Sequence, residues 1–532
     1  MTAVSDRRLT VADGRPGVHR RPRALRDAPV SRWAALIAIL PAAAAAAVSL
    51  RGLGDREMWE DEYATWHASA LSLTQLVGLL RHIDMVHATY YLILHGWVQL
   101  AGSSPLALRL PSVFAMAICA ACVALIGRRL ATAPVGLVAG LIFAVVPSVS
   151  RYAQEARSYA LVTMGAAVAT LMLLRALEKD TRLRLALYGL SIAFIGLVHF
   201  VALTVLGAHA VLILMTTRPT EARRWRIVEA GGIAMLVVIP LLALASQQSS
   251  AIGWITADAE RVKTFPEHVF LSTPVATTII ILALAGATLL LTSRRPGDRN
   301  VAAMLATWAL LPPIFCYVSF PLLHLFLPRY VLFIVPAWTI LAAVAACRAG
   351  ELVWRHLWPL TAAVAILVVA WVGLADQRAV RASPVAGQPD FRGATTEIHD
   401  RLKSGDGIVY NDPFGASADL ARQAVTYEMR DEPRPRDVFL RQTGMERGWY
   451  AASECVDPEP CLGTTPRLWL IYTGSSPDPF AGMAADRASL LKRDYKVAGT
   501  AKFTGVVLVL LTRSASQPGT KAGRPAARAH DH

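Results

Sequence analysis

Long apolar runs, separated by short polar segments rich in arginine, fill about the first two thirds of the chain. The runs hold roughly 16 to 22 residues, and a helix of that length can cross the hydrocarbon core at about 1.5 Å per residue, the shorter ones where it is locally thinned. We count eleven such runs, and the pattern therefore predicts eleven membrane-spanning helices. The runs cover residues 33–50, 111–127, 134–148, 157–177, 184–199, 201–216, 228–246, 274–292, 302–320, 330–347 and 357–375.

Two parts of the chain depart from this pattern. Residues 51–110 form a long first loop, in which 68–82 and 90–100 have apolar residues at helical spacing but too many polar groups to cross a membrane. These two segments predict helices that lie in the membrane interface. Residues 376–513 are polar and alternate helix-like with strand-like patterns, which predicts a small α/β domain. The expected helices of this domain are 392–403, 416–427 and 479–493, and its expected strands are 407–410, 468–472 and 505–512.

The composition favours a membrane protein over a soluble one. Hydrophobic residues make up 54% of the chain, charged residues make up 17%, and the mean hydropathy is +0.42. We therefore expect an all-α polytopic membrane bundle of about eleven transmembrane helices, with a small extracytoplasmic α/β C-terminal domain. The expected parts are a cytoplasmic basic tail (1–30), a transmembrane domain (31–375), the α/β domain (376–513) and a disordered tail (514–532).

The arginines predict the orientation, because short cytoplasmic loops of membrane proteins carry an excess of Lys and Arg. The N-terminal tail holds seven arginines, which places it in the cytoplasm. An odd number of spans then puts the C-terminal domain outside the cell, in a multi-pass protein of the plasma membrane. This topology and contact with anionic membrane lipids explain the net charge of +15, so we expect no nucleic-acid partner. Later basic clusters fall on the same cytoplasmic side, at residues 128–129, 179–184, 218–226, 294–299 and 348–355.

Two cysteines, Cys455 and Cys461, lie in the expected outer domain, whereas the other four lie in apolar segments. An exported compartment permits disulfides, and the two prolines between these cysteines suit a short closed loop. We therefore predict a disulfide between Cys455 and Cys461. The alternative is a pair of free thiols.

Acidic, basic and aromatic residues with no obvious role in solvating a loop gather on the expected outer face. Moving a sugar from a lipid phosphate to a hydroxyl needs a carboxylate to take the acceptor proton, cations to hold the phosphate, and aromatic rings around the sugar and the lipid. The outer face supplies all three. The candidate catalytic acids are Asp61 and Glu62, the candidate phosphate-binding residues are Arg157, Arg329 and Tyr330, and the candidate substrate-lining residues are Trp59, Tyr63, His87, Tyr90, Glu155 and Tyr159.

Each of these residues also has an ordinary structural explanation. An Asp-Glu doublet after a span is often solvated or caps a helix, and Arg329 can reach the membrane surface as a snorkelling side chain. Glu155 and Arg157 can form a surface ion pair, and Trp and Tyr are common at membrane interfaces. The histidines show no spacing typical of a metal site, so no metal is expected. Only the joint occurrence of these residues on one face favours a reaction site.

Six motifs, ordered along the chain, are similar to those of a known family; they lie at residues 59–62, 87–91, 102–112, 127–130, 152–161 and 328–333. This series resembles the bacterial GT-C glycosyltransferases over the chain to about residue 375. More narrowly, it resembles the branch of protein O-mannosyltransferases and aminoarabinose transferases, in the form found in actinobacterial mannosyltransferases. The resemblance implies that Asp61 is the catalytic base, with Glu62 beside it. It also implies that Glu155 and Arg157 line the active site and that Arg329 meets the lipid phosphate.

This chain departs from the family in the 152–161 motif, where some members carry an Asp and this chain has Gln and Glu. It implies an inverting, metal-independent transfer of a sugar, with mannose expected, from a polyprenyl-phosphate donor to an envelope glycan, lipid or protein outside the membrane. No cofactor is expected. The alternatives are an arabinofuranosyl transferase or a polymer ligase with a similar donor, or a transporter or flippase. A transporter would carry ionisable residues in mid-span and an internal repeat, and the sequence shows neither.

Overall fold

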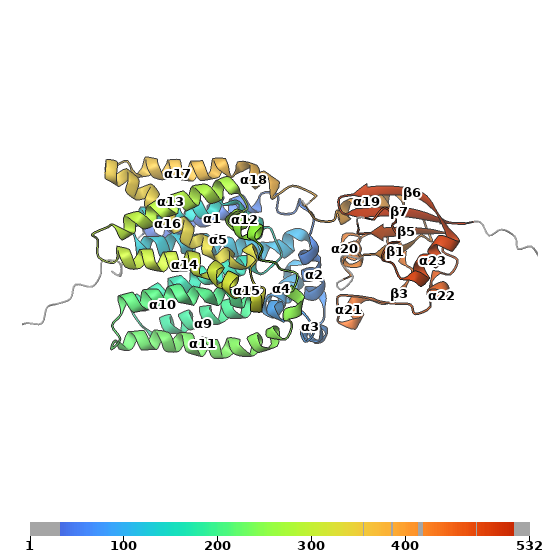
Figure 1. Cartoon of the computed structure of the whole chain (residues 1–532), viewed down its shortest axis with the longest axis horizontal. Coiled ribbons are helices and arrows are strands. Elements are labelled where there is room, and N and C mark those ends of the chain that lie inside the picture. The colour runs from blue at the N-terminus through green and yellow to red at the C-terminus, as the bar shows by residue number, and fades with distance from the viewer. Residues whose placement is uncertain (1–31, 355, 385–386, 413–418, 475, 515–532) are drawn as a thin grey trace, which may run out of the picture.

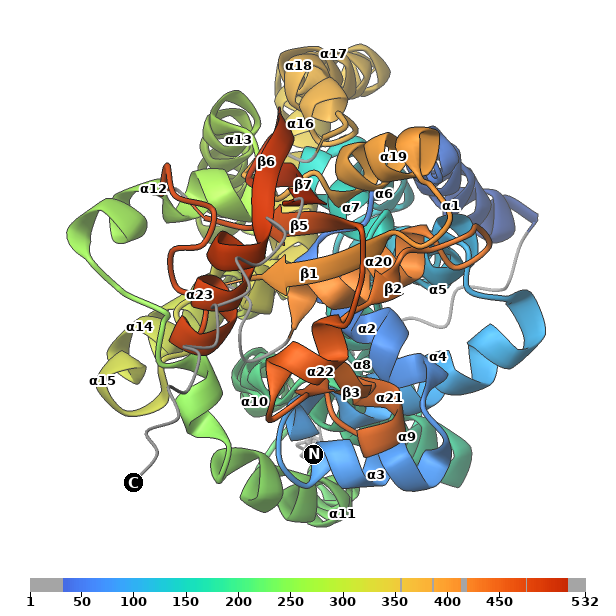
Figure 2. The same cartoon turned by 90° about the vertical axis from the view of Figure 1, so that its right-hand side faces the viewer.

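The computed structural model describes residues 32–354, 356–384, 387–412, 419–474 and 476–514. The chain folds into a helix bundle and a smaller C-terminal domain, which lies at one end of the bundle (Figure 1). Figure 2 looks onto that domain, with its sheet in front of the bundle helices. The predicted basic tail, residues 1–30, and residues 515–532 of the predicted disordered tail lie outside the described residues.

Every apolar run of the sequence coincides with a helix or a pair of helices in the bundle. Side chains of polar residues cap several of these helices: Thr132, Thr181 and Ser272 each accept a backbone N–H from the helix that follows. The main bundle helices are α1 (Arg32–Leu50), α5 (Pro105–Leu130), α6 (Ala133–Val145), α7 (Pro147–Ala153), α8 (Tyr159–Glu178), α9 (Arg182–Val198), α10 (Val205–Thr216), α11 (Ala222–Ser246), α13 (Thr273–Leu291), α14 (Asp298–Val318), α16 (Val335–Val353) and α17 (Trp358–Val372). Shorter elements connect them: η3 (Phe200–Thr204), η4 (Ser249–Ile252), α12 (Ala259–Phe270), α15 (Phe320–Leu323), η5 (Pro328–Ile334) and α18 (Leu374–Ala379).

Fewer helices reach spanning length than the sequence predicts. Within the described residues, six helices are long and apolar enough to cross a membrane, and α6 and α7 together would make a seventh. The apolar helices Ala35–Leu50, Phe200–Thr216 and Trp358–Val372 are shorter, and α9 has 17 residues. The helical membrane bundle is confirmed, but the predicted count of eleven spans is not.

The chain bends by 64° between α6 and α7. Pro147 opens α7, and the residue before a proline is pushed out of the helical conformation, as the ψ angle of 129° at Val146 shows. Helix α7 then leads into the turn 154–158, which connects it to α8. The bend brings this turn, with Glu155 and Arg157, to the end of the bundle that faces the first loop.

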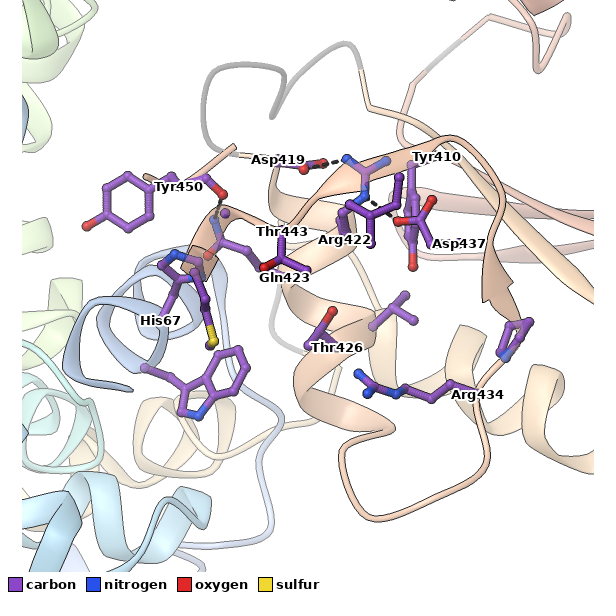
Figure 3. Close-up of a pocket in the computed structure, with 16 residues that line it drawn as sticks. His67, Tyr410, Asp419, Arg422, Gln423, Thr426, Arg434, Asp437, Thr443 and Tyr450 are labelled. Atoms are coloured by element: carbon purple, nitrogen blue, oxygen red, sulfur yellow. Dashed lines mark hydrogen bonds and ion pairs between the residues drawn. The ribbon is translucent and has the colours of Figure 1, made fainter. Parts of the chain in front are cut away.

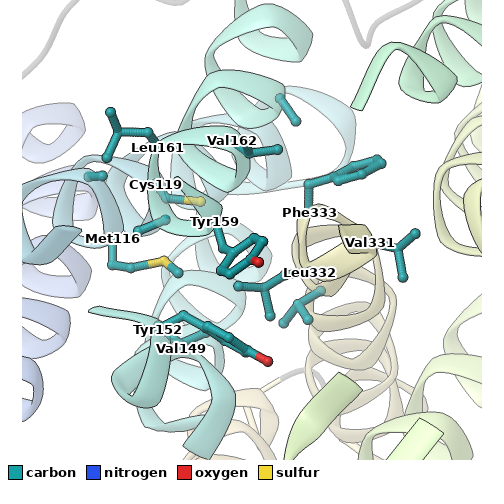
Figure 4. Packing of buried hydrophobic residues seen from close by; sticks show 14 of the residues in the cluster. Met116, Cys119, Val149, Tyr152, Tyr159, Leu161, Val162, Val331, Leu332 and Phe333 are labelled. Carbon is teal, nitrogen blue, oxygen red and sulfur yellow. The ribbon is translucent and has the colours of Figure 1, made fainter. Parts of the chain in front are cut away.

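Small residues let the bundle helices approach closely. A Cβ atom at Gly136 would lie 2.2 Å from the carbonyl oxygen of Ala124, and one at Gly286 would lie 2.0 Å from the carbonyl oxygen of Leu341. Nearer the first loop, larger buried side chains from α5, α7, α8 and η5 pack together, as Figure 4 shows. This packing fixes the positions of the turn 154–158 and of η5.

The first loop folds into α2 (Glu60–Ala70), α3 (Leu73–Leu80), η2 (Met85–His87) and α4 (Ala88–Ala101). The predicted helix over 68–82 is instead divided between α2 and α3, because Ser72 starts a new helix with a capping box. Three acids, Glu60, Asp61 and Glu62, stand in the first turn of α2, where the positive end of the helix dipole stabilises negative charge. Helices α2 and α3 lie between the bundle and the C-terminal domain (Figure 1).

The C-terminal domain contains a five-stranded mixed sheet in the order β2-β1-β5-β7-β6. Strand β1 is parallel to β2 and β5, whereas β7 is antiparallel to β5 and β6. The predicted strands at 407–410, 468–472 and 505–512 are confirmed as β1, β5 and β7, and β6 was not predicted. The elements are α19 (Phe391–Arg401), β1 (Gly407–Asn411), α20 (Leu420–Glu428), β2 (Arg436–Asp437), β3 (Leu440–Gln442), α21 (Gly444–Arg447), β4 (Ser453–Glu454), α22 (Pro458–Leu462), β5 (Arg467–Tyr472), α23 (Ala485–Asp494), β6 (Tyr495–Phe503) and β7 (Val506–Arg513).

The two faces of this sheet pack against different parts of the protein, since alternate residues of a strand point to opposite sides. Val409, Leu468 and Leu470 join a small cluster with α23. Trp469 and Ile471 belong to the same continuous hydrophobic core as the bundle helices, together with residues of α19 and α20. The domain is therefore packed onto the bundle.

Cys455 and Cys461 form a disulfide, as the sequence predicts, and the bond closes a short loop that includes most of α22. The other four cysteines are buried in bundle helices and are free thiols.

Candidate active site

Asp61 lies between two arginines that come from distant parts of the chain. Its Oδ2 atom is 3.6 Å from Nε of Arg157, in the turn before α8, and 3.8 Å from Nη2 of Arg329, in η5. Both distances exceed the length of a hydrogen bond. Among the described residues, Oδ2 of Asp61 and the Nε atoms of both arginines are buried without a hydrogen-bond partner. All three side chains therefore keep hydrogen-bonding capacity for a substrate.

The neighbouring acid, Glu62, is directed into the protein. Arg109 of α5 donates Nε and Nη2 to its two carboxylate oxygens, each at 2.8 Å, and the backbone N–H of Ala156 donates to Oε1 at 2.8 Å. The Glu62 side chain is 0% exposed, whereas that of Asp61 is 27% exposed. Burial alone would raise the pKa of Glu62, but Arg109, Arg56 and the Ala156 N–H outweigh it and lower the pKa to about 2. Glu62 thus ties α2 to α5 and to the turn 154–158.

Cationic side chains surround Trp59, the residue before α2. The guanidinium groups of Arg151 and Arg329 lie 5.8 and 5.5 Å from its ring centre, within cation–π range. Together with Arg56, these residues line a cavity of about 340 Å³. Glu155 also lines it and accepts a hydrogen bond from Arg151 at 2.5 Å, while burial raises the pKa of Glu155. The three arginines outnumber the two acids that line this cavity, Glu155 and Asp376, and this surplus of positive charge favours an anionic ligand.

Residues of the first loop hold Arg157 in place. It donates to Nε2 of His87 at 3.0 Å and to the hydroxyl groups of Tyr91 and Thr65, each at 3.3 Å. Because arginine has no acceptor, Nε2 of His87 must accept this bond, and burial and Arg157 keep the pKa of His87 well below its usual range. Tyr90 is buried with its ring centre 6.3 Å from that of Tyr91. Its hydroxyl has no hydrogen-bond partner within the described part of the chain.

The C-terminal domain reaches this cluster through Tyr450. Oδ2 of Asp84 accepts hydrogen bonds from Tyr91 at 2.8 Å and from Tyr450 at 2.7 Å, and the two tyrosine hydroxyls lie 3.2 Å apart. Tyr91 in turn accepts from Arg157. A hydrogen-bonded chain therefore connects the C-terminal domain to the arginine beside Asp61.

Further aromatic rings lie near Arg329. Its guanidinium lies 5.9 Å from the ring centre of Tyr159. The ring of Tyr330 lies 6.3 Å from that of Tyr159 and 4.7 Å from that of His199. The structure thus brings the predicted residues Tyr159 and Tyr330 to the arginine that flanks Asp61, and it adds His199 to them.

Tyr63 lies elsewhere, and the prediction that it lines the substrate site is not supported. Its hydroxyl donates to Glu428 at 2.8 Å, and its ring contacts Phe391 and Tyr427 of the C-terminal domain. On a helix, side chains two positions apart are rotated by about 200° around the axis and therefore lie on nearly opposite faces. Tyr63 therefore faces away from Asp61 and binds the C-terminal domain to α2.

Sequence reasoning missed Arg56, Arg109, Asp84 and Tyr450. Arg109 did carry a signal, because an arginine inside an apolar helix is costly unless it is paired. Tyr450 carried none, since it stands 366 residues from Asp84 along the chain. No group of three or more His, Cys, Asp or Glu side chains is placed to hold a metal ion, as far as the described residues go.

Comparisons with known proteins agree with this architecture. Residues 88–243 match the family model described as dolichyl-phosphate-mannose-protein mannosyltransferase. No curated protein matches the chain in sequence. Among solved structures, ArnT from Cupriavidus metallidurans in the apo state has a TM-score of 0.57 at 17% identity, and ArnT bound to undecaprenyl phosphate has a TM-score of 0.54 at 16% identity. Each match covers 89% of this chain and 97% of ArnT, which shows a shared fold. The family match over residues 88–243 and this shared fold together indicate a glycosyltransferase.

Proposed function

We propose that the chain transfers mannose from a polyprenyl-phosphate donor to an acceptor hydroxyl outside the cytoplasm, with inversion at the anomeric carbon. The observation that carries this proposal is Asp61 between Arg157 and Arg329, with unused hydrogen-bonding atoms on all three. A similar fold, that of ArnT, was solved with undecaprenyl phosphate, which supports a lipid phosphate as the leaving group. The name of the matching family model supports mannose as the sugar.

In the proposed reaction, Asp61 takes the proton of the acceptor hydroxyl while the hydroxyl oxygen attacks the anomeric carbon. The bond from that carbon to the phosphate oxygen breaks, and the lipid phosphate leaves with the electron pair. Arg157 and Arg329 stabilise the charge on the phosphate with forked N–H donors. A single displacement from the opposite side inverts the anomeric centre. The proposal assigns no step to a cofactor or a metal.

The other predicted residues take supporting roles in this scheme. Glu62 positions α2 and the turn 154–158 through its buried ion pair. His87 and Tyr90 surround Arg157, and His87 orients it. We propose that four residues line the sugar and the lipid phosphate: Trp59, Glu155, Tyr159 and Tyr330.

The decisive test is transfer by the purified full-length protein in lipid nanodiscs. Radiolabelled polyprenyl-phosphate mannose is incubated with the protein and with separate glycan, lipid and protein fractions of a cell envelope. We expect label to move to one of these fractions. Transfer from polyprenyl-phosphate arabinose or aminoarabinose, with none from the mannose donor, would contradict the sugar but keep the reaction class.

Arg329 gives a prediction about the donor. We expect Arg329→Ala to weaken binding of polyprenyl-phosphate mannose about ten- to hundredfold, as loss of a charge-assisted hydrogen bond does. Arg329→Lys should lose less, because lysine keeps the charge but not the planar fork. Donor affinity is measured by equilibrium binding in nanodiscs. Arg261→Ala is the control, since Arg261 is exposed and pairs with Asp258; equal affinities for all three variants would mean that the phosphate binds elsewhere.

The proposed topology places the N-terminus in the cytoplasm and the C-terminal domain outside, as the arginine distribution indicates. We therefore expect protease added to intact cells to remove a C-terminal tag. We also expect non-reduced digests of the native protein to contain Cys455 and Cys461 joined in one peptide. A tag that is cleaved only after the cells are permeabilised would contradict this topology.

A further inference from the structure

A second cavity lies between the C-terminal domain and the first loop. It has a volume of about 500 Å³. Figure 3 shows His67 and Tyr450 on one side of it and Tyr410, Asp437 and Arg434 on the other. Trp66 and His67 of α2 form the wall that comes from the first loop. The cavity is therefore complete only where the two parts of the protein meet.

An ion-pair cluster builds the wall that comes from the C-terminal domain. Arg422 of α20 lies 2.5 Å from Asp419, 2.6 Å from Asp437 and 2.6 Å from Glu454, and its guanidinium lies 4.7 Å from the ring centre of Tyr410. This network holds the side chains in fixed directions, as charge-assisted pairs do. The cavity thus has a rigid polar wall before any ligand binds.

The charges that line the cavity cancel. The lining has two positive side chains, Arg422 and Arg434. It also has two negative ones, Asp419 and Asp437. Burial lowers the pKa of His67 to about 4, so His67 is uncharged at neutral pH. A neutral ligand therefore fits the cavity better than a strongly anionic or cationic one.

Groups that suit hydroxyls remain available on the cavity wall. Oδ1 of Asp437 is buried without a hydrogen-bond partner among the residues that the structure describes. Arg434 is exposed, and no ion pair to it is present within the same residues. The rings of Trp66 and Tyr410 add apolar surface. Fixed carboxylate and guanidinium groups beside aromatic rings are the chemistry that recognises a neutral sugar, which has both hydroxyl groups and apolar C–H faces.

The cavity is coupled to the candidate active site in two ways. Trp66 lies five residues after Asp61 on the same helix, which is about 8 Å along the helix axis. Tyr450, which lines the cavity, also donates to Asp84 in the hydrogen-bonded chain that leads to Arg157. A ligand in this cavity lies within a few sugar units of the proposed base.

We propose that this cavity binds a neutral saccharide unit of the acceptor, away from the hydroxyl that receives the new sugar. That the bound saccharide belongs to the acceptor rests on the proposed function. The binding of a neutral saccharide in this cavity does not depend on it. The site would hold a growing or preformed glycan so that its reactive end extends toward Asp61. The enzyme would then prefer acceptors of at least a few sugar units over a single sugar.

The first test is direct binding, with the full-length protein in nanodiscs. Neutral tetrasaccharides of mannose, glucose and arabinose are titrated by calorimetry, with an acidic tetrasaccharide of uronic acid as the charge control. We expect at least one neutral tetrasaccharide to bind more tightly than the acidic one. Arg434→Ala, which removes donors, and Thr426→Phe, which fills the cavity, should each weaken that binding about tenfold.

Arg441→Ala is the matched control, because Arg441 is an exposed arginine of β3 that does not line the cavity. It should bind the tetrasaccharide like the unaltered protein. No binding of any neutral tetrasaccharide, or equal binding by all three variants, would overturn the proposal, even if sugar transfer from the lipid donor is observed. Binding that is lost in Arg434→Ala and Thr426→Phe would support the site, even if mannose transfer fails.

Discussion

Replacement of Asp61 by Asn is expected to reduce sugar transfer by about 100-fold or more, the usual cost of removing a general base. The amide is nearly the same size as the carboxylate but cannot take the proton of the acceptor hydroxyl. Asp61 is 27% exposed and lies 3.6 Å from Arg157 and 3.8 Å from Arg329 without a hydrogen bond to either, so the substitution breaks no close contact between them. The measurement is turnover of the purified variant in nanodiscs with saturating polyprenyl-phosphate mannose.

Asp55→Asn provides the control for this experiment. Asp55 is an exposed acid of the same loop, six residues earlier, and lies outside the cluster around Arg157. Its variant should turn over at the normal rate. Both variants should keep the thermal unfolding midpoint of the unaltered protein. Normal turnover by Asp61→Asn would show that another group takes the proton.

Glu62→Gln is expected to lower the stability of the protein, whereas Asp61→Asn is expected to lower its turnover. Breaking a buried ion pair costs about 3 to 5 kcal/mol, because one charge stays buried without its counter-charge. Here the charge left behind is Arg109, which also donates to the backbone carbonyls of Leu53, Arg56 and Glu57 and so cannot turn away. The free energy of unfolding, measured with denaturant in micelles, should fall by about this amount.

The same pair predicts a dependence on pH. The pKa of Glu62 is about 2 in the folded protein, below its ordinary value of 4.5. Its contribution to stability is therefore complete above about pH 4.5 and is lost as the pH falls toward about 2. Glu432→Gln is the matched control, since Glu432 is 52% exposed, and its effect should stay within about 0.5 kcal/mol. A loss for Glu62→Gln as small as that of the control would contradict the structural role of the ion pair.

The apolar pattern predicts the bundle well because membrane-spanning helices need long runs of apolar residues. It does not predict how long each helix remains regular. The run at 134–148 ends in the bend at Pro147, and the run at 201–216 includes the 3-10 turn η3. Such breaks depend on local backbone geometry and on the neighbouring helices. The same limit explains why a single segment, 68–82, became two helices.

The candidate site was predicted in part. Asp61, Arg157 and Arg329 carry charge at the ends of apolar segments, which is unusual enough to be noticed in the sequence. The difference between Asp61 and Glu62 could not be predicted, because it depends on Arg109, which lies 47 residues further along the chain. Tyr63 was expected at the substrate for a related reason, whereas its hydroxyl and its ring contact residues of the C-terminal domain. Partners that are distant in sequence decide which of several neighbouring side chains faces the substrate.

The hydrogen-bonded chain from Tyr450 through Asp84 and Tyr91 to Arg157 has a consequence for protein engineering. A chimera that keeps this bundle but carries a C-terminal domain without a hydroxyl at the position of Tyr450 would leave Asp84 with one donor fewer. Arg157 would then be held less firmly beside Asp61. Grafted domains should therefore work only when they restore a hydroxyl donor at that position, so the C-terminal domain cannot be exchanged as an independent module.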